Sequence, residues 1–109
     1  MNGLKAEGIE LASSLAERMA VEPDPAFDMV VCPPFTFIEA IGGSIAGTPI
    51  ALGAQNCHAA EKGAHTGDVS AGMLADLGCR FVIVGHSERR TDHGEKDAAV
   101  KAKAAAVLA

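Results

Sequence analysis

Short apolar runs alternate with longer helical segments along the chain, and this alternation restricts the possible folds more than any other feature of the sequence. Each apolar run ends at a proline, a glycine or a polar group, which is typical of a strand. The predicted strands are 29–32, 50–56 and 80–85, and the predicted helices that follow them are 35–43, 70–78 and 95–109. Strands that alternate with helices predict βαβ units, hence a parallel sheet whose strands are buried.

The residues before the first predicted strand have the pattern of an amphipathic helix. Their apolar side chains recur mostly at three- and four-residue spacing, which places them on one helix face. They are Leu4, Ile9, Ala12, Leu15, Ala16 and Met19. Pro23 and Pro25 are expected to end this helix, because proline cannot continue the backbone hydrogen-bond ladder. Ser70 is expected to cap the start of the helix at 70–78, and Gly78 to stop its end.

Composition and charge exclude several classes of protein. The 109 residues are 49% hydrophobic, which fits one domain, or part of one, with an apolar core. The formal net charge is −5, from 9 basic and 14 acidic residues. A nucleic-acid partner is not expected, because a protein that neutralises phosphates carries a basic stripe. A membrane segment is not expected either, since no apolar run approaches the roughly 20 residues that a spanning helix needs.

The cysteines and two of the histidines do not form a recognisable metal site. Cys32, Cys57 and Cys79 lack the spacing of metal ligands, so reduced thiols are the simplest interpretation. Reduced thiols and the absence of a signal-peptide pattern favour a cytoplasmic protein. His58 and His65 are interpreted as surface residues of a loop. A metal site made from them and Cys57 is disfavoured because their spacing matches no ligand motif.

The stretch VIVGHSERR places His86 at the end of an apolar strand and in front of four polar or charged residues. Parallel α/β folds bind ligands just past the carboxyl ends of their strands. At the start of a short helix, free backbone N–H groups and the helix dipole favour the neutral imidazole. A neutral imidazole can donate a hydrogen bond to a carbonyl oxygen, which makes His86 a candidate electrophile for an enediol-like transition state.

Each functional interpretation has a structural alternative. Without its neighbouring motifs, a histidine such as His86 is more often a polar residue satisfied within the core. Thr66 can be an ordinary turn residue before Gly67. Ser70 is better explained as a helix cap than as a nucleophile, because no base has a motif-like relation to it. The charged residues after His86 resemble a solvated face, and no glycine-rich cradle accompanies them, which argues against a P-loop or dinucleotide fold.

Several blocks occur together and in order: MNG, VVCPPFTFI, LGAQNCHAAEKGAHTGDVSAGMLADLGC, VIVGHSERR and the pair Gly94-Glu95. In this combination the chain closely resembles the triosephosphate isomerase family. The resemblance implies a (β/α)8 barrel, of which residues 1–109 form one partial domain with about three βα units. It also implies glycolytic and gluconeogenic interconversion of dihydroxyacetone phosphate and glyceraldehyde 3-phosphate through an enediol, with no cofactor and no metal.

Transferred residue by residue, the resemblance implies that His86 is the electrophile acting on the substrate oxygens, with Ser87 and Glu88 as supporting residues. The loop 57–70 would form a homodimer by reaching into the neighbouring subunit. In that loop Thr66 corresponds to the tip residue that contacts the other subunit's active site. The other positions with implied roles are Gln55 and Asn56 at the base of the loop, and Arg89, Arg90 and Glu95 as structural residues.

The resemblance also implies parts that these residues do not contain. The family's catalytic lysine precedes the MNG block, and its general-base glutamate, lid loop and phosphate-binding glycines lie beyond Ala109. We therefore expect the isolated chain to be inactive. His93 departs from the family, in which an aromatic residue is common at that position. The alternative function is a catalytically inactive structural or assembly module, a part-barrel whose exposed strand edges pair with a second copy or with the missing half.

Overall fold

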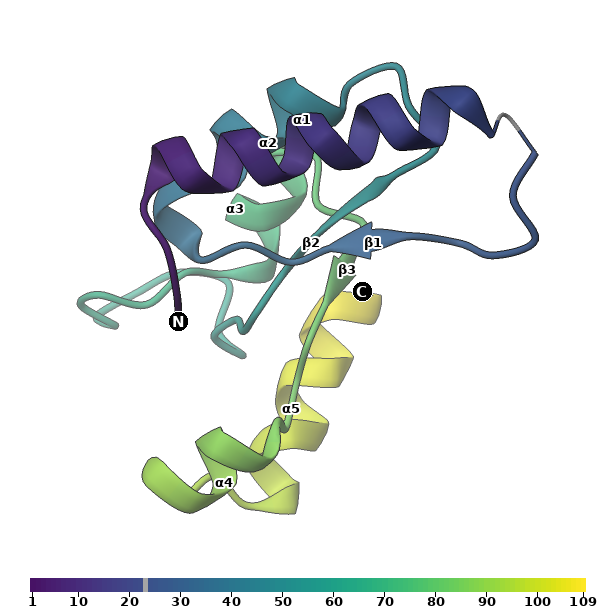
Figure 1. The fold of residues 1–109 in the computed structure, drawn as a ribbon. Coiled ribbons are helices and arrows are strands. Elements are labelled where there is room, and N and C mark those ends of the chain that lie inside the picture. The colour runs from purple at the N-terminus through teal and green to yellow at the C-terminus, as the bar shows by residue number, and fades with distance from the viewer. Residues whose placement is uncertain (23) are drawn as a thin grey trace.

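The computed structural model describes residues 1–22 and 24–109 (Figure 1). In chain order its elements are α1 (Lys5–Val21), β1 (Val30–Val31), the 3-10 helix η1 (Phe35–Phe37), α2 (Ile38–Ile45), β2 (Ala51–Ala54), α3 (Ala71–Asp76), β3 (Phe81–Val82), α4 (Ser87–Asp92) and α5 (Asp97–Leu108). The predicted alternation is confirmed, although each strand is shorter than predicted. The predicted helix stop at Pro23 lies outside the described residues. None of the described helices combines the length and the apolar character needed to cross a membrane.

The three strands form one parallel arrangement in the order β1-β2-β3. In the register between them, Val30 pairs with Ala51, and Gly53 pairs with Phe81. A Cβ atom at Gly53 would lie 2.7 Å from Cys32 Sγ and 3.0 Å from the Phe81 carbonyl oxygen, so the middle strand has no room for a side chain there. Because the strands are parallel, the segments that follow them emerge at the same edge of the sheet.

The core lies between the sheet and the helices α1 and α2, which run side by side in Figure 1. The amphipathic stripe predicted for α1 is confirmed, because Ala12 and Met19 are buried and Leu15 packs against the core. Leu4 is the exception at 75% exposed, since it precedes the helix. The other buried apolar residues are Phe37, Ile38, Ile41, Ile45, Ile50, Leu52, Ala54, Cys57 and Leu74.

The prediction that all strands are buried is wrong for the two outer strands. Val30 in β1 is 38% exposed, and Phe81 and Ile83 in and after β3 are 48% and 39% exposed. Each outer strand pairs with only one neighbouring strand. The helices α1 and α2 pack together at the top of the view in Figure 1, whereas α4 and α5 lie at the bottom, away from them. Burial on both faces is therefore confined to the central strand, where Leu52 and Ala54 are buried on one face and Gly53 on the other.

Two predictions about helix ends are confirmed and one is corrected. Ser70 caps α3, because its Oγ accepts a hydrogen bond from the Met73 backbone N–H at 3.2 Å. Gly78 follows the helix with a φ of 92°, a left-handed conformation that favours glycine. The helix predicted to end at Gly43 continues to Ile45, since burial of Ile45 in the core stabilises the last turn.

Candidate functional site

A hollow of about 600 Å³ lies past the carboxyl ends of the strands, where parallel α/β folds bind ligands. Its walls come from the three segments that follow β1, β2 and β3, together with Met1. The sheet thereby gathers five of the residues singled out in the sequence around one space. They are Gln55 and Asn56 after β2, and His86, Glu88 and Arg89 after β3.

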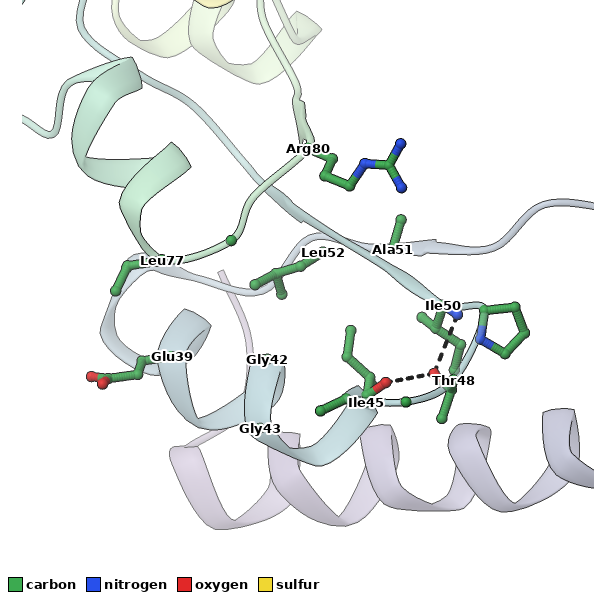
Figure 2. Close-up of a pocket in the computed structure, with 14 residues that line it drawn as sticks. Glu39, Gly42, Gly43, Ile45, Thr48, Ile50, Ala51, Leu52, Leu77 and Arg80 are labelled. Carbon is green, nitrogen blue, oxygen red and sulfur yellow. Dashed lines mark hydrogen bonds between the residues drawn. The ribbon is translucent and has the colours of Figure 1, made fainter.

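A second hollow, of about 420 Å³, lies at the opposite end of the sheet (Figure 2). Its turn is already paired internally, because Thr48 Oγ1 donates to the Ile45 carbonyl oxygen at 2.6 Å and accepts from the Ile50 N–H at 3.2 Å. The charged side chains on its wall, Glu39 and Arg80, are exposed and extend in different directions in Figure 2. We therefore place the candidate site in the first hollow.

His86 is the N-cap residue of α4, and its ring is held by a local hydrogen bond. The Glu88 backbone N–H donates to His86 Nδ1 at 3.1 Å. Since Nδ1 must be unprotonated to accept this bond, the proton of the neutral ring lies on Nε2. The side chain is 49% exposed at the wall of the hollow, so the Nε2–H group is an available donor. Gly85, with a φ of 68°, makes the turn that places His86 there.

The other sequence-predicted residues divide into those at the hollow and those away from it. Gln55 Nε2 donates to the Cys32 carbonyl oxygen at 2.9 Å and so joins the segment after β2 to the segment after β1. Ser87 begins α4 and is exposed, and it does not belong to the wall of the hollow. Thr66 is exposed near the tip of the loop and also lies outside that wall.

A group of ion pairs begins at Arg89, in the wall of the hollow, and joins α4 to α5. Arg89 Nε donates to Glu95 Oε2 at 3.0 Å, and Lys103 Nζ donates to the same oxygen at 2.7 Å. Arg90 Nη1 donates to Asp97 Oδ1 at 2.6 Å. Sequence reasoning missed Lys103. The one feature of the sequence that could have indicated Lys103 is its position, eight residues after Glu95 on the helix that follows.

The hydrogen bond from Lys103 is the main cause that holds the pKa of Glu95 below its ordinary value of 4.5, with Arg89 adding to the effect and burial opposing it. A carboxylate whose pKa is lowered by folding stabilises the native state above its unfolded pKa and loses that contribution as the pH falls. We therefore expect the wild type to lose stability below pH 4.5 more steeply than a Glu95→Gln variant. Urea unfolding at several pH values measures this, and parallel pH curves would contradict it.

The loop 57–70 holds a cluster that the sequence did not predict. The rings of His58 and His65 stack with centroids 4.0 Å apart and planes 29° apart, and Asp68 Oδ2 lies 3.9 Å from His58 Nε2. His58 Nδ1 accepts a hydrogen bond from the Ala60 N–H at 2.9 Å, which places the proton of the neutral ring on Nε2. The ligand atoms of His58, His65 and Asp68 lie within 4.8 Å of one another. The Ala60 N–H occupies the lone pair of His58 Nδ1, and Nε2 carries the proton, so neutral His58 has no free lone pair for a metal ion.

Cys57 does not add to that cluster. Its side chain is buried in the core at 1% exposed, and burial raises the pKa of its thiol. A buried neutral thiol is a poor nucleophile and a poor metal ligand.

A parallel sheet whose strands lead into helices, with polar residues gathered past the carboxyl ends, defines this chain as a parallel α/β protein, the class that includes the (β/α)8 barrels. The candidate site centres on His86, which lies past the carboxyl end of β3 and caps α4. The family model described as triosephosphate isomerase matches residues 1–109. The chain belongs to the triosephosphate isomerase family.

Individual relatives agree with the family match. The chain is 55% identical to a triosephosphate isomerase of Gluconacetobacter diazotrophicus over 109 residues, which are 100% of this chain and 44% of the relative. It is 54% identical to one of Afipia carboxidovorans over 106 residues, which are 97% of this chain and 41% of the relative. A crystal structure of triosephosphate isomerase from Bartonella henselae superposes with a TM-score of 0.84 at 38% identity, covering 99% of this chain and 44% of that one. The predicted barrel fold is confirmed, and the chain spans less than half the length of these relatives.

Proposed function

We propose that the whole protein interconverts dihydroxyacetone phosphate and glyceraldehyde 3-phosphate by proton transfer through an enediol. The observation that carries this proposal is the Glu88 N–H bond to His86 Nδ1 at 3.1 Å, which makes Nε2–H a donor at the wall of the hollow. The relatives from Gluconacetobacter diazotrophicus and Afipia carboxidovorans are both triosephosphate isomerases, which supports the same reaction.

The chemistry of the step needs a donor aimed at an oxygen that becomes negative. When a base removes a proton from the carbon beside the carbonyl, charge develops on the carbonyl oxygen, and a fixed N–H donor stabilises it. A neutral imidazole suits this role because it donates without being deprotonated too easily. Triosephosphate isomerase is itself the standard example of a neutral histidine electrophile that works with a glutamate base. In this proposal His86 is the electrophile, and Glu88 supports it through its backbone N–H.

The reaction also needs a base and a cation that binds phosphate, and the resemblance to the family implies that both lie outside residues 1–109. We therefore expect the 109-residue chain alone to show no turnover above a buffer blank, whereas the whole protein isomerises both triose phosphates. A coupled assay measures this, with NADH oxidised when dihydroxyacetone phosphate is the product and NAD⁺ reduced when glyceraldehyde 3-phosphate is the product. Turnover by the isolated chain that is lost in a His86→Gln variant would contradict the expected inactivity, and a silent whole protein would contradict the function.

We also propose that the whole protein is a homodimer formed through the loop 57–70. Two features support this role. The base of the loop is closed by the His58 N–H bond to the Val69 carbonyl oxygen at 2.8 Å and by a bridge between His58 and Ser70, while Thr66 near the tip is exposed. Sedimentation equilibrium of the whole protein tests the proposal, and a monomer at micromolar concentration would contradict it.

We place the protein in the cytoplasm because Cys32, Cys57 and Cys79 are free thiols, which suits a reducing compartment. Cell fractionation with detection of the protein tests this, and recovery from an oxidising compartment would contradict it. The alternative of an inactive assembly module rests on the exposed outer strands, and no further observation favours it over the isomerase.

A further inference from the structure

Lys103 contacts two groups that lie far apart in the sequence. Its Nζ donates to Asn56 Oδ1 at 2.8 Å and to Glu95 Oε2 at 2.7 Å. The first of these bonds joins residues 47 positions apart. The side chain of Lys103 is only 12% exposed, so its ammonium group depends on these two acceptors. A lysine that is nearly buried and bonded on two sides is held in one place.

The Glu95 carboxylate links Lys103 to Arg89 on α4. Its side chain is 5% exposed, and Oε2 accepts from both Arg89 and Lys103. The other oxygen, Oε1, is buried and has no hydrogen-bond partner among residues 1–22 and 24–109. The negative charge of Glu95 is therefore balanced by two cations at one oxygen, one from α4 and one from α5.

Arg89 contacts both this carboxylate, through its side chain, and the candidate electrophile His86, through its backbone. Its backbone N–H donates to the His86 carbonyl oxygen at 3.0 Å, within the first turn of α4. Asn56, at the other end of the connection, forms part of the wall that follows β2. Lys103 thus joins the wall that carries His86 to the wall that carries Asn56.

We propose that Lys103 is a positioning residue that fixes Asn56 relative to His86 across the candidate active site. Its effect on the shape of the site stands without the proposed isomerase function, whereas its effect on turnover rests on that function. The rival interpretation is an ion pair that only stabilises the fold. The two interpretations make different predictions about Asn56. If Lys103 only stabilises the fold, its ion pair with Glu95 suffices, and loss of the bond to Asn56 should not change the site.

Three variants separate these interpretations. Lys103→Met keeps the aliphatic stem but removes the donors, and it leaves Glu95 buried with one cation fewer, so the thermal midpoint falls. Lys103→Met combined with Glu95→Gln also removes that buried charge, so the midpoint recovers toward the wild type. The bond to Asn56 stays lost in both variants. Lys101→Met is the control, because Lys101 lies on the same helix and is exposed.

The first readout does not depend on activity. In ¹H–¹⁵N NMR spectra of the protein, Lys103→Met and the double variant shift the side-chain amide of Asn56 and the imidazole nitrogens of His86, whereas Lys101→Met leaves both unchanged. The proposal would be overturned if the double variant recovers its thermal midpoint and its spectra match the wild type at Asn56 and His86. The ion pair would then be structural only.

The second readout is catalysis by the whole protein. We expect kcat to fall about tenfold in both Lys103 variants with KM within about twofold of the wild type, because a displaced group near the reacting atoms lowers the rate more than it lowers binding. Recovery of kcat along with stability in the double variant would overturn the proposal. If the wild type itself has no isomerase activity, the proposed function fails, and the NMR spectra still decide the role of Lys103.

Discussion

Replacing His86 by asparagine in the whole protein is expected to lower kcat by about 10²- to 10³-fold, the usual cost of removing one donor to a developing oxyanion. The thermal midpoint is expected to stay close to that of the wild type. Asparagine is a good N-cap residue, and its Oδ1 can accept the Glu88 N–H that His86 Nδ1 accepts now. It has no group at the place of Nε2–H. The variant therefore removes the donor and keeps the cap.

Two further variants make this experiment decisive. His86→Ala removes both the donor and the cap, so it should lose the same rate and also destabilise the protein by about 1 kcal/mol. Thr91→Ala, at an exposed position of the same helix, should change neither property. Steady-state kinetics and thermal unfolding of the three variants measure both effects. A His86→Asn enzyme with more than about a tenth of wild-type kcat would refute the role of His86 as electrophile.

Replacing Gly85 by alanine is expected to lower the free energy of unfolding by about 2–5 kcal/mol. Two physical costs add here. Gly85 has a φ of 68°, which a residue with a Cβ adopts only with strain. A Cβ at position 85 would also lie 2.8 Å from Val100 Cγ1 on α5 and 3.1 Å from the flexible end of Arg90, at Nη2, so Val100 and the backbone at position 85 would have to move apart. His86 follows directly, and activity should fall with stability.

Gly94 provides the matched control for Gly85. Its φ is 65°, and a Cβ atom there would have no other atom within 4 Å. Gly94→Ala therefore includes the conformational strain alone, about 1–2 kcal/mol, and the difference between the two variants measures the packing clash. Adding Val100→Ala to Gly85→Ala should restore part of that difference. Urea unfolding gives all four free energies, and equal losses at Gly85 and Gly94 would contradict the clash.

The local elements of this protein could be predicted from the sequence. The spacing of apolar residues gives α1, the apolar runs give three parallel strands, and Ser70 and Gly78 act at the ends of α3 as predicted. These signals work because capping, turn formation and side-chain periodicity depend on residues within a few positions of each other. The motif blocks likewise sufficed to identify the family.

The exposure of the outer strands and the contacts between distant residues could not be predicted in the same way. Phe81 looks as apolar as Leu52 in the sequence, yet it is 48% exposed and Leu52 is 6% exposed, because the two strands differ in their neighbours. The stacking of His58 on His65 likewise depends on how the loop closes.

By itself, then, the sequence determined the order of strands and helices, the family and the place of His86 between a strand and the helix that follows it. Only the tertiary structure decided which strand is covered, and that Lys103 on α5 bonds both Asn56 and Glu95. The physical reason is range. A helix cap or an apolar helix stripe depends only on residues within one element. The partner of a buried charge depends on which helices and loops pack together, and these meet only when the chain has folded.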